Sequence, residues 1–454
     1  MLVKESNTWE VLRDHLAHDN TIGLNEYLSE LSGEESLRAL MRLEPDEQQQ
    51  ILARLTPESA ADVFEFIPDE SAGELLGDLN PEVAASIVSE MSSDEQADVL
   101  SELDAEDLEE ILSYMDDRDV IEARQLMAYE DDVAGGLMMK EYFSFPRMFR
   151  ASSVLADLAS REEEYELNNV LYIYVTGRGG ELLGVARIRD IIVATPETRL
   201  TDILHPAMSV KDTAQLDELE DFFDENNMSA VPVVDDNNRI LGVVRRRAVY
   251  DAVAERADAD HLKSQGIVGG EELRAMPTSV RSRRRLSWLS VNILLNVIAA
   301  SVIAQFQDVL SAVIILAVFL PIVSDMSGCS GNQAVAVSMR ELSLGIINRS
   351  DLYYVWRKEV VVGLINGTAL GFLISMIAWV WQGNGWLGLV VGMALALNTV
   401  LAVSIGGTVP VILKSLKIDP AVASGPILTT ITDMCGFFLL LGTASLMLPL
   451  LTGT

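Results

Sequence analysis

Residues 360–413 read VVVGLINGTALGFLISMIAWVWQGNGWLGLVVGMALALNTVLAVSIGGTVPVIL, and none of these 54 side chains is charged. A helix of about 20 apolar residues is enough to cross the hydrocarbon core of a bilayer. The stretch is therefore long enough for two crossings, and residues 381–385, WQGNG, provide a turn between them. A soluble enzyme is excluded, and an integral membrane protein is predicted.

Outward from this stretch, the whole C-terminal part of the chain is poor in charge. Between Leu286 and Thr454 there are only 13 charged residues, six basic and seven acidic. Counting about 20 residues for each crossing predicts a transmembrane domain of five helices over residues 286–454. Their expected bounds are about 286–306, 309–327, 360–381, 386–413 and 421–448.

Basic residues mark one side of the predicted membrane domain. The connectors QFQD and WQGNG contain no Lys or Arg, whereas the other loops and the approach to the first span contain Arg281, Arg283, Arg284, Arg285, Arg340, Arg349, Arg357, Lys358, Lys414 and Lys417. Because basic loops stay in the cytoplasm, the N-terminus is predicted to be cytoplasmic and the C-terminus to lie outside a cell (inner) membrane.

The part of the chain before Leu286 has the opposite character. It contains 27 Lys and Arg against 61 Asp and Glu, so its formal charge is −34. Such a polyanion repels phosphate, which argues against a nucleic-acid partner. The two cysteines form no CxxC pair and the four histidines have no ligand spacing. No nucleophile and base pair of catalytic spacing is visible either, so the chain is not expected to be an enzyme. The segment from Met1 to Asn20 contains no apolar run, so no secretory signal is expected.

An internal repeat with a twelve-residue period runs from Leu43 to Met127. Leu43, Leu55, Ile67, Leu79, Met91, Leu103, Met115 and Met127 form one row at this spacing. Starts such as EPDE, TPES and NPEV place a proline near the first helical position. Each repeat is predicted to be one short helix with a turn, and residues 1–130 are predicted to stack as an acidic, superhelical solenoid.

After residue 130 the hydrophobic period changes to that of short strands. VLYIYVTGRGGELLGVARIRDI and SAVPVVDDNNRILGVVRRRAV each read as strand, turn, strand and helix. They predict two similar α/β modules, over residues 131–199 and 200–261, of a kind suited to regulation. Residues 262–285 are predicted to be a connecting helix with an interruption at Gly269 and Gly270 and a basic end.

One carboxylate suggests what the membrane domain does. Asp433 lies within the fifth predicted span, where a charge costs about 3 kcal/mol unless it faces water or a cation. Thr429 adds a hydroxyl, and the segment PIVSDMSGCSGNQ in the second span adds Asn332 and glycines such as Gly328 that can open backbone carbonyls. Oxygen ligands suit hard cations such as Mg²⁺. A cation pathway is predicted, and a buried, protonated structural acid is the alternative.

Three segments of this sequence resemble the MgtE-type magnesium channels or transporters. They are RKEVVVGLINGTALG at 357–371, SIGGTVP at 404–410 and KSLKIDPAVASGPILTTITDMCG at 414–436. They follow one another along the chain in the same order as in that family. The resemblance implies an acidic helical N domain, tandem CBS (cystathionine β-synthase) modules, a plug helix and five transmembrane helices. It also implies a homodimer in which Asp433 of both subunits binds hydrated Mg²⁺.

The resemblance further implies regulation by cytoplasmic Mg²⁺. Bound at acidic faces, the ion would favour a closed state. The candidate residues for this role are Asp251, Asp258, Asp260, Glu90, Asp94 and Glu95. ATP binding to the CBS pair is left open, with Asp190 as the residue matching the family's pattern. The second module reads Arg245-Arg246-Arg247-Ala248 where relatives often have Thr and Asp, and these arginines are expected to pair with acids.

The predicted function is therefore a channel that imports Mg²⁺ down its electrochemical gradient and closes when internal Mg²⁺ is high. Two alternatives stay open. One keeps the fold but makes the chain a coupled divalent-cation transporter or an exporter. The other is a membrane-bound CBS sensor with a membrane domain that does not conduct.

Overall fold

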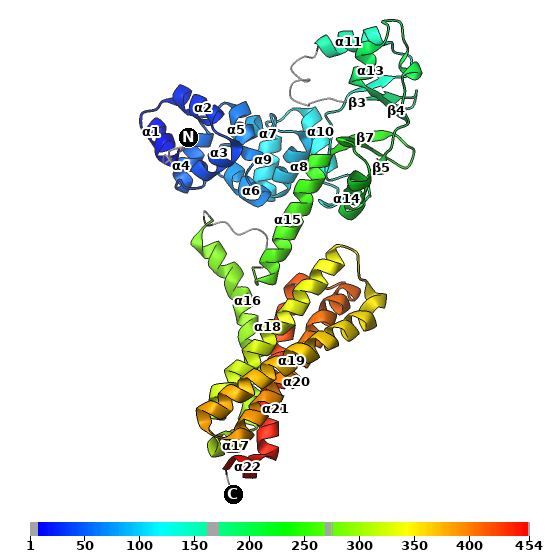
Figure 1. Cartoon of the computed structure of the whole chain (residues 1–454). Coiled ribbons are helices and arrows are strands. Elements are labelled where there is room, and N and C mark those ends of the chain that lie inside the picture. Colours follow the sequence, from blue (N-terminus) through cyan, green and yellow to red (C-terminus); the bar gives the residue numbers. More distant parts are fainter. Residues whose placement is uncertain (1–7, 161–171, 268–273, 275, 453–454) are drawn as a thin grey trace, which may run out of the picture. The chain divides into compact units, whose positions relative to one another are not determined.

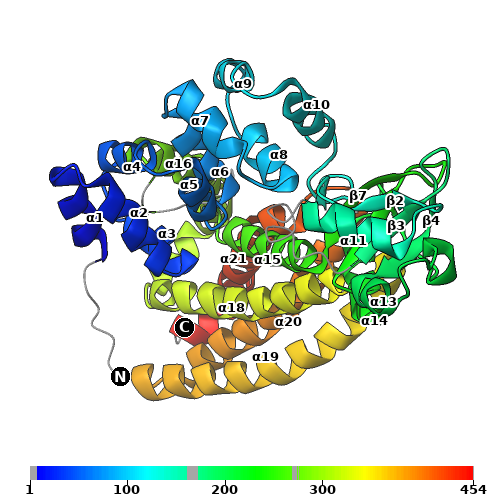
Figure 2. The same ribbon diagram turned by 90° about the horizontal axis from the view of Figure 1, so that it is seen from above.

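The computed structural model describes residues 8–160, 172–267, 274 and 276–452 of the 454-residue chain. It divides into two compact units, Met1–Ala257 and Asp258–Thr454, which are described separately. Figures 1 and 2 show the elements in two views.

The N-terminal unit begins with ten short helices, called the repeat domain below. Seven of them begin at the spacing of the sequence repeat: α4 (Pro45–Leu52), α5 (Pro57–Phe64), α6 (Asp69–Gly77), α7 (Pro81–Val88), α8 (Ser93–Ser101), α9 (Ala105–Leu112) and α10 (Asp117–Leu126). They follow α1 (Thr8–Ala17), α2 (Thr21–Glu30) and α3 (Gly33–Leu40). The predicted helix-and-turn repeat is confirmed.

Local chemistry fixes where these helices start. Proline occupies the first turn of α4, α5 and α7, and the Thr56 and Asn80 side chains accept hydrogen bonds from the backbone of their own helices. From α5 to α10, each helix packs on the helix two places away, as α5 does on α7 and α6 on α8. The rows of apolar residues at the repeat spacing thereby form one continuous core, in which Leu52, Leu76 and Leu100 are fully buried.

Two α/β modules complete the N-terminal unit. One sheet has the order β2-β3-β4, with β2 (Ser144–Pro146), β3 (Tyr172–Thr176) and β4 (Leu182–Arg187). The other sheet has the order β1-β7-β6-β5, with β1 (Met138–Met139), β5 (Val210–Lys211), β6 (Ala230–Val234) and β7 (Ile240–Arg245). The helices are α11 (Ala151–Ser160), α13 (Ile188–Val193), the 3₁₀ turn η1 (Leu200–Asp202), α14 (Leu216–Glu225) and α15 (Arg246–Ser264).

The two modules repeat the same plan. In each, a parallel pair is followed by an antiparallel hairpin with a register shift at the equivalent place, between Val175 and Thr176 and between Val233 and Val234. One detail differs from the predicted division of the chain. Residues 138–139, expected in the first module, pair with β7 of the second. Residues 170–171 of the first predicted strand lie outside the described residues.

The C-terminal unit is helical. Its elements are α16 (Thr278–Ala304), α17 (Gln307–Ala312), α18 (Leu316–Ser343), the 3₁₀ turn η2 (Arg349–Asp351), α19 (Leu352–Gln382), α20 (Gly385–Ser415), α21 (Pro420–Leu446) and α22 (Leu448–Thr452). Figure 2 shows α18, α20 and α19 side by side, and α21 packs on both α18 and α20. The predicted connecting helix, 262–285, is divided between the end of α15 and the start of α16, and its Gly269-Gly270 interruption lies outside the described residues.

Glycines allow α19 and α20 to approach closely. A Cβ atom at Gly392 would lie 2.5 Å from the carbonyl oxygen of Gly371, and one at Gly367 would lie 2.6 Å from that of Ala396. Gly383, with φ at 67°, ends α19 and turns the chain into α20. Small residues at such positions are typical of helix pairs in membranes.

Four described helices are long and apolar enough to cross a membrane, at Thr278–Ala304, Arg349–Gln382, Gly385–Ser415 and Gly425–Leu446. The predicted count of five is therefore not confirmed by length and composition. The prediction for the second span, 309–327, was also wrong in its bounds. The helix breaks at Val313, and α18 begins at Leu316 and continues to Ser343. Polar residues lower the mean hydropathy of α18, so this helix is not among the four. Its length of 28 residues would be enough to cross a membrane.

Candidate cation-binding sites

The side chain of Asp433 is positioned by α21. This helix starts at Pro420, and the Asp419 carboxylate accepts a hydrogen bond of 2.8 Å from the backbone N–H of Ala421. Thr429, Asp433 and Phe437 follow one another at one-turn spacing and therefore lie on one face of the helix. All three line the same groove in the C-terminal unit.

The opposite wall of the groove is a polar stripe on α18. Ser324, Asp325, Gly328, Cys329 and Asn332 follow at helical spacing and line it. Ile303 of α16 contributes to a third wall. The groove has a volume of about 590 Å³. It brings together all four residues that the sequence suggested for the pathway, namely Asp433, Thr429, Gly328 and Asn332.

Asp433 is half-buried and its nearest polar partner is neutral. The Ser324 hydroxyl donates a hydrogen bond to the Asp433 carboxylate. Within the described part of the chain, no Lys, Arg or His lies within ion-pair distance of Asp433 or Asp325. The two carboxylates therefore give the groove a negative character that cations would offset.

The buried side-chain amide of Asn398 forms a hydrogen bond with the backbone of α21. Asn398 of α20 is fully buried and donates a hydrogen bond of 3.1 Å to the carbonyl oxygen of Thr432, the residue before Asp433. Its Oδ1 atom is buried and has no hydrogen-bond partner in the described residues. Asn398 thereby links the backbone beside the Asp433 carboxylate to the middle of a neighbouring apolar helix.

The expectation that glycines such as Gly328 open backbone carbonyls was wrong, because α18 is a continuous helix through Gly328 and Gly331. Gly331 instead allows close packing: a Cβ atom there would lie 3.1 Å from the carbonyl oxygen of Ala402. At Gly328 a Cβ atom would meet only the Thr432 hydroxyl, at 4.0 Å. Side chains rather than opened backbone supply the oxygen atoms of this groove.

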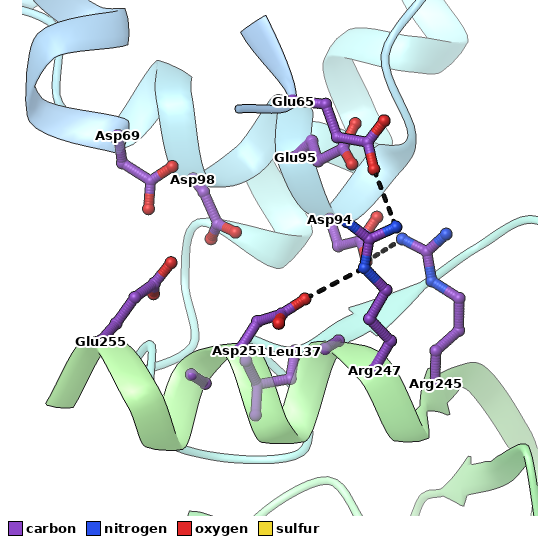
Figure 3. A pocket seen from close by; sticks show the side chains of 12 residues that line it. Glu65, Asp69, Asp94, Glu95, Asp98, Leu137, Arg245, Arg247, Asp251 and Glu255 are labelled. Atoms are coloured by element: carbon purple, nitrogen blue, oxygen red, sulfur yellow. Dashed lines mark hydrogen bonds and ion pairs between the residues drawn. The ribbon is translucent and has the colours of Figure 1, made fainter. Parts of the chain in front are cut away.

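A second acidic site lies in the N-terminal unit, between the repeat domain and the second module. This acidic pocket has a volume of about 160 Å³. Figure 3 shows its lining, which contains seven carboxylates and two guanidinium groups: Glu65, Asp69, Asp94, Glu95, Asp98, Asp251, Glu255, Arg245 and Arg247. Side chains from α8 and the ends of neighbouring repeats face the start of α15 across it.

The arginines pair with acids, as the sequence suggested. Arg245 Nη2 lies 3.0 Å from Asp94 Oδ2, and Asp94 is only 6% exposed. Arg247 Nη1 lies 3.1 Å from Glu65 Oε1, and its Nε lies 3.3 Å from Asp251 Oδ2. Dashed lines in Figure 3 mark these three ion pairs.

Crowding of like charges is strongest at Asp98. Burial, and then the neighbouring carboxylates of Asp69 and Asp94, raise the pKa of Asp98 to about 8. Burial, followed by the nearby Asp94 carboxylate, also raises the pKa of Glu95. A proton or a metal cation would therefore be favoured in this part of the pocket.

Only some of the predicted regulatory acids meet in this pocket. Asp94, Glu95 and Asp251 line it, whereas Glu90 and Asp258 are exposed elsewhere, and Asp260 Oδ1 lies 3.9 Å from Lys263 Nζ. Sequence reasoning missed four lining acids, Glu65, Asp69, Asp98 and Glu255. The helical spacing within the repeat was the available signal, because Asp98 lies one helical turn after Asp94 and faces the same way.

Asp190, the candidate nucleotide-binding residue, is occupied by local contacts. Its Oδ2 lies 2.8 Å from His205 Nε2 and its Oδ1 lies 3.5 Å from Arg189 Nε. The hydrogen bond from His205 lowers the pKa of the Asp190 carboxyl below its ordinary value. A ligand that used Asp190 would have to share it with the imidazole.

Neither site is built like a tight metal centre. Over the described residues, no group of three or more His, Cys, Asp or Glu side chains is arranged to hold a metal ion. A strongly hydrated ion such as Mg²⁺ needs only one or two carboxylates, since it keeps several of its water ligands. The groove and the acidic pocket are compatible with that mode of binding.

Comparison with known families matches three parts of the chain. A family model described as "Divalent cation transporter" matches residues 320–443, which include Asp433, Thr429 and the polar stripe of α18. The "MgtE intracellular N domain" model matches residues 31–132, and the CBS domain model matches residues 200–255. The predicted fold of a helical N domain, a CBS domain and several apolar helices is confirmed.

Curated relatives match across most of the chain. The magnesium transporter MgtE of Bacillus subtilis is 33% identical over 322 residues, 70% of each chain, and that of Thermus thermophilus is 33% identical over 331 residues, 72% of each. Among solved structures, the soluble part of a magnesium transporter matches with a TM-score of 0.50 at 26% identity, over 55% of this chain and 98% of that one. The cytosolic domain of the Mg²⁺ channel MgtE in complex with ATP also gives a TM-score of 0.50, at 30% identity, over 53% of this chain and 98% of that one.

Proposed function

Because this chain belongs to the MgtE family of magnesium transporters, we propose that it is a channel that imports Mg²⁺ down its electrochemical gradient. The observation that carries this proposal is the groove between α18 and α21, where Asp433 faces hydroxyl and amide side chains and no cation among the described residues. A carboxylate at membrane depth is retained for function, since it costs free energy unless water or a cation offsets it.

In this proposal Mg²⁺ passes as a partly hydrated ion. Asp433 supplies the charge that attracts it, and Thr429 and Asn332 bond to water molecules of its hydration shell. Two chains form a homodimer in which both grooves face a common axis, so that the two Asp433 carboxylates repel each other until a divalent ion lies between them. The fifth crossing is α18, whose polar stripe faces the pathway instead of lipid. The chain lies in the cell (inner) membrane with its N-terminal unit in the cytoplasm, and it has no enzymatic activity.

Cytoplasmic Mg²⁺ closes the pathway by binding in the acidic pocket. Asp94, Glu95 and Asp98 line this pocket from α8, and Asp251 lines it from α15. An ion that binds the closed state more tightly than the open state shifts the population towards the closed state. ATP binding by the CBS pair is a further proposal, supported by the relative of known structure that was solved with ATP.

Proteoliposomes test conduction directly. The purified chain is reconstituted, an inside-negative potential is applied without any Na⁺ or H⁺ gradient, and Mg²⁺ entry is followed with a trapped indicator dye. We expect entry through the wild type and its loss in Asp433→Asn. Asp308→Asn is the matched control, because Asp308 is an exposed carboxylate of α17 outside the groove.

The same experiment separates the alternatives. Entry that needs a second ion gradient would make the chain a coupled transporter or an exporter. A correctly folded wild type without flux would leave the non-conducting sensor. Loading the vesicles with increasing Mg²⁺ tests the regulation, which predicts that entry stops at high internal Mg²⁺.

A further inference from the structure

The repeat domain and the second module share an apolar contact. Ala97 of α8 and Leu126 of α10 are buried in the same core as Phe223 and Val244 of the second module. Such a contact favours the docked arrangement at any Mg²⁺ concentration. The seven carboxylates of the acidic pocket, which lies beside it, oppose docking through their mutual repulsion.

Arg245 offsets this repulsion at the buried end of the pocket. Its guanidinium group meets Asp94 at 3.0 Å, where the Asp94 side chain is 8% exposed. The second oxygen of Asp94, Oδ1, is buried without a hydrogen-bond partner in the described residues. The negative charge of Asp94 is therefore stabilised mainly by Arg245, because removing the guanidinium group would leave the carboxylate buried and uncompensated.

Neighbouring contacts hold the same end of α8. The Glu141 carboxylate accepts hydrogen bonds from the Ser93 backbone N–H at 3.2 Å and from the Ser93 hydroxyl at 2.8 Å. Arg247 then bridges Glu65 of the repeat domain and Asp251 of α15. Its side chain is 67% exposed, so this bridge is weaker and more sensitive to salt than the Arg245 pair.

We infer that Arg245 and Arg247 are built-in cations that hold the repeat domain on the second module in the absence of divalent ions. A guanidinium group keeps its charge at every physiological pH and cannot dissociate from the chain, unlike a bound metal ion. Asp69 and Asp98 lie at the other end of the pocket in Figure 3 and remain for an exchangeable cation. Any effect of this docking on the pathway rests on the proposed function, but the docking itself does not.

Hydrogen–deuterium exchange of the full-length protein in detergent tests the inference without labels. The amides of α8 and β7 are followed with a chelator and with saturating Mg²⁺. We expect the wild type to stay protected in chelator. In Arg245→Gln combined with Arg247→Gln we expect these amides to exchange about tenfold faster in chelator, with Mg²⁺ restoring most of the protection.

Matched variants separate this role from a general loss of stability. Arg256→Gln removes a different cation of α15, one that pairs with Asp217 outside the pocket, and should leave α8 protected. Arg245→Lys keeps the positive charge, so its α8 and β7 amides should keep most of the wild-type protection in chelator. The amides of β3 and β4, in the other sheet, report whether the double variant is folded.

Two results would overturn the inference. One is a wild type whose α8 amides exchange as fast in chelator as those of the double variant. The other is a folded double variant that stays fully protected in chelator. Flux measurements on the same variants are independent: a wild type that conducts no Mg²⁺ would refute the proposed function and leave the exchange result intact.

Discussion

At the scale of single residues, the role of the Ser324 hydroxyl beside Asp433 can be tested by mutation. Ser324 donates a hydrogen bond to the carboxylate and is buried between α18 and α21. Its removal leaves the carboxylate to be oriented by water alone, and a hydrogen bond to a charged group contributes about 2 kcal/mol. We expect Ser324→Ala to lower Mg²⁺ uptake clearly, though less than Asp433→Asn does.

The control for this prediction lies one turn away on the same helix. Ser327 is also buried, but its hydroxyl donates to the Val323 carbonyl oxygen at 2.8 Å and does not reach Asp433. Ser327→Ala should therefore leave uptake unchanged. Equal losses in both variants would show that the hydroxyl of Ser324 matters for helix packing only.

The burial of Asp98 predicts that the stability of the N-terminal unit depends on pH. The pKa of Asp98 is about 8 in the folded chain against an ordinary value of 3.8, because burial and neighbouring carboxylates disfavour its charge. The folded state therefore binds a proton that the unfolded state has lost, so stability falls as pH rises from about 4 to about 8 and then levels. We expect Asp98→Asn to remove this contribution and to raise the melting temperature at pH 8 relative to the wild type.

Thermal unfolding of the purified protein at several pH values checks this expectation. Glu90→Gln is the control, since Glu90 is an exposed acid of the same repeat domain outside the pocket. A wild type and an Asp98→Asn variant with parallel pH profiles would contradict the assigned role of Asp98.

The acidic pocket shows how far single residues could be predicted. Asp94 and Asp251 were both named as candidates through the family resemblance, but their proximity depends on how α8 docks on α15, which the sequence does not state. Asp258 was chosen with them because it lies next to the predicted connecting helix. At 1.5 Å per residue it lies about 10 Å further along α15, beyond the pocket.

At the scale of elements, periodicity predicted some features well and others badly. The regular spacing of apolar rows and helix starts predicted the repeat helices because local capping and core packing agree there. The second span was misplaced because SAVIILAVFL is apolar on both sides of the break at Val313. Hydropathy does not distinguish a continuous helix from two helices in such a stretch.

The α19–α20 pair provides a prediction at this scale. Valine at position 392 would place its Cβ atom 2.5 Å from the carbonyl oxygen of Gly371, which belongs to backbone and cannot move aside. Overpacking of this kind costs about 1–3 kcal/mol or more. We expect Gly392→Val to lower the melting temperature in detergent and to broaden the size-exclusion peak. Gly442→Val is the control, because a Cβ atom at Gly442 meets nothing within 4 Å in the described residues.

At the scale of the whole molecule, charge is divided along the chain. The part before Leu286 carries −34 and the part from Leu286 onward −1, although the latter contains six cations. Two of the six lie near the C-terminal end of α20, Lys414 and Lys417, and one near the C-terminal end of α18, Arg340. The other three lie just before α19 or in its first turns, at Arg349, Arg357 and Lys358. The connector between α19 and α20 has none. Since basic loops are retained in the cytoplasm, this asymmetry predicts the orientation of every helix end.

Cysteine labelling of intact cells tests that orientation. In a variant without Cys329 and Cys435, Gln382→Cys lies at the exposed C-terminal end of α19, and Leu344→Cys lies in the exposed loop after α18. We expect an impermeant maleimide to label position 382 from outside and position 344 only after the membrane is opened. The reverse pattern would place the acidic N-terminal unit outside the cell. There it could not respond to cytoplasmic Mg²⁺, so the proposed regulation would fail even if Asp433 still conducts the ion.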